Sequence, residues 1–221
     1  MLSKKLLFLF VLFIPCVSHG ATVVKTWNFA STTEGLADAG NSTPLTFAAE
    51  TSTGNPTNSV KFSESSKNTS NTEYARNPST GETWETWGVP AGATVTSIQF
   101  TAWSEFTDPS TLGPTVNNFS ARIIDSGGTS VTSGAGDPIP TTAMGTGDTA
   151  WNVQSAGSSR SVDAGKQAST TDVRLELQQD VTTSGPLGIL LQEYDTFELT
   201  ITYTSGAAGA TKSRHRIITS Q

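Results

Sequence analysis

Apolar and polar residues alternate with a period of two along much of this chain, and helical periodicity is almost absent. Such alternation predicts β-strands that bury one face and leave the other in water. The clearest example is the segment 197–203, in which Phe197, Leu199 and Ile201 share one face. The pattern predicts further strands at 173–177, 119–123, 23–29, 45–47, 60–62, 72–76, 84–87, 95–106 and 187–191.

The residues between these strands are mostly Gly, Pro, Asn, Asp and Ser, which favour turns. Many short antiparallel strands predict an all-β fold, specifically an antiparallel two-sheet β-sandwich with jelly-roll connections. The stretch 126–171 is different, because it is rich in Gly, Ser and Thr and poor in apolar residues. We expect a long loop region there, either functional or a mobile insertion, with one short strand at 149–153.

Three of the five tryptophans lie between Thr83 and Trp103. Strand parity places Phe100 on an apolar face and Trp103 on the opposite face, together with Gln99 and Glu105. A tryptophan on a wet face needs a specific reason. A β-bulge turns it into the core, a loop or the chain's tail covers it, or it stacks on a ligand or partner.

Trp84 and Trp87 are separated by an odd number of residues. If 83–87 is one extended strand, their side chains face opposite sides, and only one of them lies in the core. Trp27 and Trp151 share a face with apolar neighbours, so we expect both in the core.

The first 20 residues have the features of a secretory signal peptide. Lys4 and Lys5 form its basic region, residues 6–14 its apolar region, and small residues precede a cleavage point before Ala21. A membrane anchor and a lipoprotein modified at Cys16 are the alternatives. The predicted mature chain is one domain, 21–204, followed by a flexible basic tail, 205–221. We expect it outside the cytoplasm, extracellular or periplasmic, with no membrane insertion after cleavage.

Charge and cysteine content limit the partners and the means of stabilisation. Without the signal peptide, 11 basic residues face 19 acidic ones, so the net charge is about −8. An acidic chain is not attracted to nucleic acid or to anionic membranes, and we expect neither as a partner. The only cysteine, Cys16, lies in the signal peptide, so the mature domain has to be held by its core rather than by disulfides.

The predicted body lacks the parts that several chemistries need. His19 and His215 lie outside it, which excludes Ser-His-Asp and Cys-His catalysis and zinc sites built from His or Cys. We therefore expect a non-catalytic protein. Glycoside hydrolysis, which needs only two carboxyl groups, is a distant alternative that Glu82, Glu85 and Glu105 keep open.

Calcium is the one candidate cofactor. Oxygen ligands on loops suit Ca²⁺, although no dedicated calcium-loop spacing is present. The acidic residues that lie in predicted turns are Asp108, Asp125, Asp137 and Asp148.

The run of segments VKTWNF, NSVKF, VPAGATVTSIQFTAW and FELTITY, spread over 23–203, is similar in layout to secreted jelly-roll modules of the carbohydrate-binding type. This resemblance implies a calcium-stabilised sandwich that binds glycans through aromatic side chains.

Two functions follow as hypotheses. The first is binding of a glycan or surface polymer through stacking rings and polar partners, namely Trp103, Trp84, Trp87, Gln99, Glu105 and Asn118. The second is a structural subunit of a cell-surface or extracellular assembly, in which the same rings or the tail bind a neighbouring copy by self-association.

Overall fold

The computed structural model describes residues 20–29, 33–39, 45–50, 59–77, 82–145, 147–184, 186 and 188–205. The predicted signal peptide up to residue 19 and the tail from residue 206 lie outside these described residues. Within the described ranges, no helix has the length and apolar character needed to span a membrane.

The described chain is all-β, apart from one short 3-10 helix. Its elements in chain order are β1 (Ala21–Asn28), β2 (Ala37–Asp38), β3 (Thr46–Glu50), β4 (Ser59–Glu64), β5 (Ser70–Arg76), β6 (Thr94–Thr107), β7 (Pro114–Ile124), β8 (Ile139–Ala143), β9 (Asn152–Gln154), β10 (Arg160–Ser161), η1 (Ala164–Lys166), β11 (Arg174–Thr183) and β12 (Leu190–Thr204).

The strands form two antiparallel sheets, which confirms the predicted β-sandwich. The larger sheet has the order β10-β6-β12-β4-β3, with β1 beside β12 and β9 beside β6. The smaller sheet has the order β2-β5-β11-β7-β8. The jelly-roll connectivity stays a prediction.

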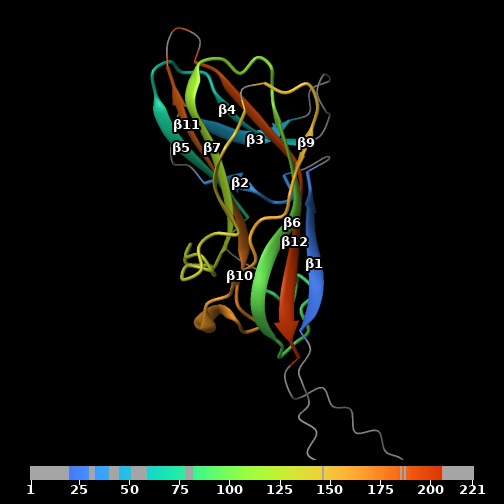
Figure 1. The fold of residues 1–221 in the computed structure, drawn as a ribbon. Helices are drawn as coiled ribbons and strands as arrows, with labels where there is room; N and C mark the ends of the chain where they lie inside the picture. Colours follow the sequence, from blue (N-terminus) through green and yellow to red (C-terminus); the bar gives the residue numbers. More distant parts are fainter. Residues whose placement is uncertain are drawn as a thin grey trace, which may run out of the picture.

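The two longest strands, β6 and β12, run along most of the molecule and change partners on the way (Figure 1). The first part of β12 pairs with β4, and its last part pairs with β1. Because Ala21 lies opposite Tyr203, the two ends of the described chain lie at the same end of the molecule.

Aromatic rings fill the core between the two sheets. The Trp103 ring stacks on Phe197 with a centroid distance of 6.0 Å, and Phe119 stacks on Tyr194 at 4.3 Å. All four side chains are buried. Large aromatic side chains contribute most of the apolar area in such a core, so this cluster is a principal source of the fold's stability.

The structure corrects the expected orientation of Trp103. Its side chain is only 4% exposed, although parity with Phe100 placed it on the wet face. The reason is a β-bulge: Ala102 and Phe100 lie opposite adjacent residues of β12, so Thr101 is an extra residue in β6. The bulge reverses the alternation, and Phe100 and Trp103 both face the core.

The prediction of a strand at 84–87 is also wrong. The segment is a turn, in which the Trp87 N–H donates to the Thr83 carbonyl and Gly88 has a φ of 99°. Strand parity does not apply to a turn. Trp84 and Trp87 are therefore both buried, with their rings edge to face at 5.5 Å.

The remaining two tryptophans differ from each other. Trp27 is buried, as predicted. The prediction that Trp151 lies in the core is wrong, because Trp151 is half-buried and packs against Phe106 on the outer side of the larger sheet, at 5.7 Å between ring centroids. Its neighbour on the same face, Val153, is 77% exposed. The region 126–171 contains β8, β9, β10 and η1, more regular structure than the single strand expected.

A chain of buried hydrogen bonds connects the two sheets through the core. The Tyr194 hydroxyl donates to Gln179 at 2.7 Å, and the Gln179 amide donates to Asn117 at 2.7 Å. Asn117 donates to Gln192 at 3.2 Å, and Gln192 donates to the Glu105 carboxylate at 2.9 Å. This series of hydrogen bonds begins on the larger sheet, passes through β11 and β7 of the smaller sheet, and ends on the larger sheet again. It therefore fixes how the two sheets face each other.

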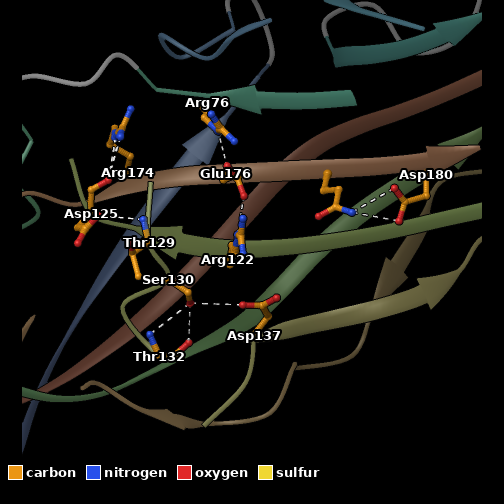
Figure 2. Close-up of polar contacts among 11 residues, drawn as sticks. Arg76, Arg122, Asp125, Thr129, Ser130, Thr132, Asp137, Arg174, Glu176 and Asp180 are labelled. Carbon is orange, nitrogen blue, oxygen red and sulfur yellow. Dashed lines mark hydrogen bonds and ion pairs between the residues drawn. The ribbon is translucent and has the colours of Figure 1, made fainter. Parts of the chain in front are cut away.

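A second polar group lies on the outer face of the smaller sheet. Figure 2 shows the Glu176 carboxylate between Arg76 and Arg122, with which it forms ion pairs. These residues lie directly opposite one another on β5, β11 and β7. The Glu176 side chain is fully covered while each arginine is about 30% exposed, so the group ties the three strands together.

We expect Tyr194→Phe to lower the free energy of unfolding by about 1–3 kcal/mol, because it leaves a buried Gln179 oxygen without a donor. Urea denaturation of the purified domain measures this. The matched control is Tyr203→Phe at a half-buried position, expected to change stability by no more than about 0.5 kcal/mol. Equal effects of the two variants would contradict the role of the buried chain.

Candidate functional site

Residues 152–161, which we call the strap, run antiparallel along one side of β6. Its first part is β9, which pairs with β6 between Trp103 and Glu105, and its last part is β10. Between these two strands, the Gly157 N–H donates to the Phe100 carbonyl at 2.8 Å. The strap therefore follows β6 past the bulge.

Two of the predicted ligand-binding side chains hold this strap in place. Gln99 donates its side-chain amide to the Gly157 carbonyl at 2.9 Å. The buried Glu105 carboxylate accepts hydrogen bonds from Asn152 at 3.0 Å and from Gln154 at 3.1 Å. These two side chains, which were predicted to bind a ligand, therefore attach the strap to β6.

A cavity of about 260 Å³ lies between the strap and edge strand β8. We call it the edge cleft. Trp103, Ile139 and Pro140 supply apolar surface, and neutral polar groups and backbone supply the rest. Its full lining is Trp103, Ile139, Pro140, Thr142, Gln154, Ser155, Ala156, Gly157 and Ser158.

A second cavity, of about 230 Å³, lies on the outer side of the larger sheet. We call it the outer hollow, and it is lined by Ala102, Trp103, Ser104, Val153, Thr196 and Glu198. It forms where both long strands are irregular, because β12 also carries an extra residue between Tyr194 and Phe197. Paired bulges bend a sheet locally, which accounts for a depression in an otherwise regular surface.

Trp103 lines both cavities, but it does not form the predicted stacking platform. Its ring packs against Phe197 and Phe119 in the core and exposes only a small fraction of its surface. The indole N–H of Trp84 donates to the Lys166 carbonyl and that of Trp87 to Glu82. No such bond ties the Trp103 N–H to another described residue.

The two cavities differ in charge. The edge cleft has no ionisable side chain, whereas the outer hollow has the Glu198 carboxylate. Close to them, burial raises the pKa of the Asp195 carboxyl, against the effect of a hydrogen bond from Thr196. Burial, with a further contribution from the nearby Glu105 charge, raises the pKa of Tyr194 well above its ordinary value.

The four predicted calcium ligands have other partners. Asp125 forms an ion pair with Lys166, and although burial opposes its ionisation, Lys166 and the Thr129 N–H hold its pKa below the ordinary value. Asp148 accepts from the Thr107 N–H, and Asp108 from that of Ser110, both at 2.7 Å. The Ser130 hydroxyl donates to Asp137. Among the described residues, no three His, Cys, Asp or Glu side chains are grouped to hold a metal ion.

The carboxyl groups considered for glycoside hydrolysis are also engaged. Glu82 accepts from the Trp87 indole and Glu85 from the Ser169 hydroxyl, while Glu105 belongs to the buried chain described above. These groups act in local structure, each with a different partner.

Comparison with models of known protein families gives no match to this chain. No curated protein is similar enough to it to indicate common ancestry.

Sequence reasoning missed most residues that line the cavities. Thr142, Gln154, Ser155 and Thr196 lie in stretches with no distinctive motif. Glu198 had one usable signal, since it is the only charged residue on the polar face of the segment 197–203. The bulges that create the outer hollow have no local signal, because Thr101 and its neighbours fit an ordinary strand.

We expect Gly157→Ala to displace the strap, because an added Cβ would lie 2.4 Å from the Pro138 carbonyl oxygen. The variant should lose about 1–3 kcal/mol of stability, and acrylamide should quench its tryptophan fluorescence more strongly. The matched control is Gly165→Ala, where an added Cβ meets nothing within 4 Å. Quenching and stability that match the control would show that the strap tolerates the change.

Proposed function

We propose that this protein is a secreted, non-catalytic module that binds a glycan or surface polymer, with one sugar unit in the edge cleft. The observation that supports this most directly is the composition of the cleft: an apolar part from Trp103, Ile139 and Pro140 beside neutral hydroxyl, amide and backbone groups. Sugars present both apolar C–H faces and hydroxyl groups, so such a lining suits them.

The size and charge of the cleft limit the class of ligand that fits it. The cleft, at about 260 Å³, is smaller than the roughly 300–1,000 Å³ of pockets for drug-sized molecules, which suits a single sugar unit of a longer chain. The lining carries no charge, and the protein as a whole is acidic. A neutral polysaccharide is therefore favoured over an acidic one.

This mode of binding differs from the one that the sequence suggested. Trp84 and Trp87 are core residues, and Trp103 contributes a small part of its surface rather than a whole ring face. Specificity then depends on the strap backbone and on the side-chain oxygens of Thr142 and Gln154 as acceptors, because the Thr142 hydroxyl donates to the Pro140 carbonyl and the Gln154 amide to Glu105. A site that relies on polar groups, with little stacking, binds one sugar unit with modest affinity. Repeated units in a polymer increase the overall affinity.

The test is to fill the cleft. Ala156→Leu places a larger side chain at its lining, and we expect binding of the neutral polysaccharide identified on a glycan array to weaken about tenfold in calorimetry. The control Ala164→Leu makes the same change at an exposed position outside the cleft and should bind like the wild type. Binding unaffected by Ala156→Leu, or no neutral glycan bound at all, would overturn the proposal.

A second candidate function, assembly with further copies, is favoured by the edge strand β1. Within the described chain, β1 pairs with β12 alone, and its Val24 side chain is 56% exposed. An open strand edge offers unpaired N–H and C=O groups to another strand, so β1 is suited to strand addition.

For this second candidate, we expect Val24→Lys to reduce self-association in light scattering at high protein concentration, because a charge on an edge strand opposes pairing. Leu112→Lys, at another exposed apolar position, is the control and should associate like the wild type. A wild-type chain that stays monomeric throughout would exclude assembly through β1.

A further inference from the structure

The outer hollow contains a carboxylate that lacks a partner. Glu198 is half-buried in β12, and no described residue forms an ion pair or side-chain hydrogen bond with its carboxylate. The residues opposite it on the neighbouring strands are Thr26 and Ala102, which are both neutral. A half-buried negative charge without a counter-charge attracts a cation.

The rest of the hollow indicates what carries that cation. Thr196 and Ser104 supply hydroxyl groups, while Ala102 and Val153 supply methyl groups. Val153 is 77% exposed, unusually high for a branched aliphatic side chain placed at the rim of a cavity. The matching ligand has a positive charge, hydroxyl groups and an apolar face.

We propose that the outer hollow is a binding site for an amino sugar, with the ammonium group of one hexosamine unit on Glu198 and its hydroxyl groups near Thr196 and Ser104. A hydrogen bond between an ammonium group and a carboxylate is roughly twice as strong as one between neutral groups. The volume of about 230 Å³ suits one sugar ring.

The surface beside the hollow favours a polymer over an isolated cation. Strand register places Thr26 beside Glu198, and Thr22 opposite Thr202, on the outer face of β1 and β12. Thr200 belongs to the same face, opposite the exposed Val24, so hydroxyl groups and one apolar side chain continue along the sheet away from the hollow. Same-face residues repeat about every 6.8 Å along a strand, which gives an extended sugar chain regular points of contact.

The outer hollow and the edge cleft are separate sites. Val153 lines the hollow, and the next residue of the strap, Gln154, lines the cleft. Adjacent strand residues point to opposite sides, so the strap separates the two cavities. The amino-sugar site does not depend on the proposed binding of neutral sugar in the cleft.

Three β-linked hexamers built from glucosamine, N-acetylglucosamine or glucose test the inference, because they differ only in an amine, an acetamide or a hydroxyl group on each ring. Calorimetry at low ionic strength should show the glucosamine hexamer binding about tenfold more tightly than the other two. Glu198→Gln should remove this preference and leave the affinity for the glucose hexamer unchanged. Asp172→Asn, the same charge change at an exposed position outside the hollow, should retain the preference.

Equal affinity of wild-type protein for all three hexamers, or a preference that survives in Glu198→Gln, would overturn the inference. If all three hexamers bind equally and Ala156→Leu weakens the binding of each, the amino-sugar inference is wrong and the neutral-glycan function stands. A glucosamine preference that persists in Ala156→Leu would support the hollow as a site of its own.

A lysine-rich peptide serves as the last comparison. If polylysine of the same charge binds as tightly as the glucosamine hexamer and shows the same dependence on Glu198, the ammonium group alone is recognised and the amino-sugar assignment is wrong. At least tenfold weaker binding of polylysine supports the contribution of the hydroxyl groups.

Discussion

The pairing of β6 with β12 is the interaction on which the rest of the structure depends. These two strands form the centre of the larger sheet, and their pairing is interrupted by extra residues at several points. One interruption turns Trp103 into the core, where it stacks on Phe197. Together with the extra residue in β12 between Tyr194 and Phe197, the same bulge opens the outer hollow on the other side of the sheet. A short irregular region of this pairing thus determines both a core contact and a surface cavity.

Polar side chains in the interior extend this organisation to the strap. Glu105 accepts hydrogen bonds from Gln192 in the core and from Asn152 and Gln154 on the strap. A buried carboxylate is tolerated only when it is well hydrogen-bonded, so the strap supplies bonds that the core alone leaves open. The strap, which separates the two proposed sites, is therefore joined to the hydrogen bonds that connect the sheets.

Alternation of apolar residues located most strands correctly, because a two-layer fold places every second residue in its core. The segments 197–203 and 119–123 lie within β12 and β7, and the all-β fold follows from such segments. Alternation misplaced Trp103, since the bulge at Thr101 arises from pairing with a strand about a hundred residues away. It also misplaced one of the pair Trp84 and Trp87, because their segment is a turn.

The candidate site was predictable only in part, for a related reason. Gln99 and Glu105 both form hydrogen bonds with the strap, but the bulge at Thr101 places Gln99 on the opposite face from Trp103 and Glu105, so the predicted common face of the three is wrong. The residues that complete the cavities come from 139–158 and from β12, and only the folded chain brings them beside β6. The predictions for the signal peptide and the tail concern residues outside the described ranges.

The pairing of β1 with β12 has a consequence for how the protein folds. The first strand of the domain completes the larger sheet only when the last strand is present, almost the whole domain later. Contacts between such distant parts of a chain form slowly, because a large loop has to close before they stabilise anything. Until β12 is in place, β6 lacks its main partner and the apolar faces of the early strands stay open to water. A chain exported from the cell starting at its N-terminus would therefore complete its fold only after the final strand had crossed.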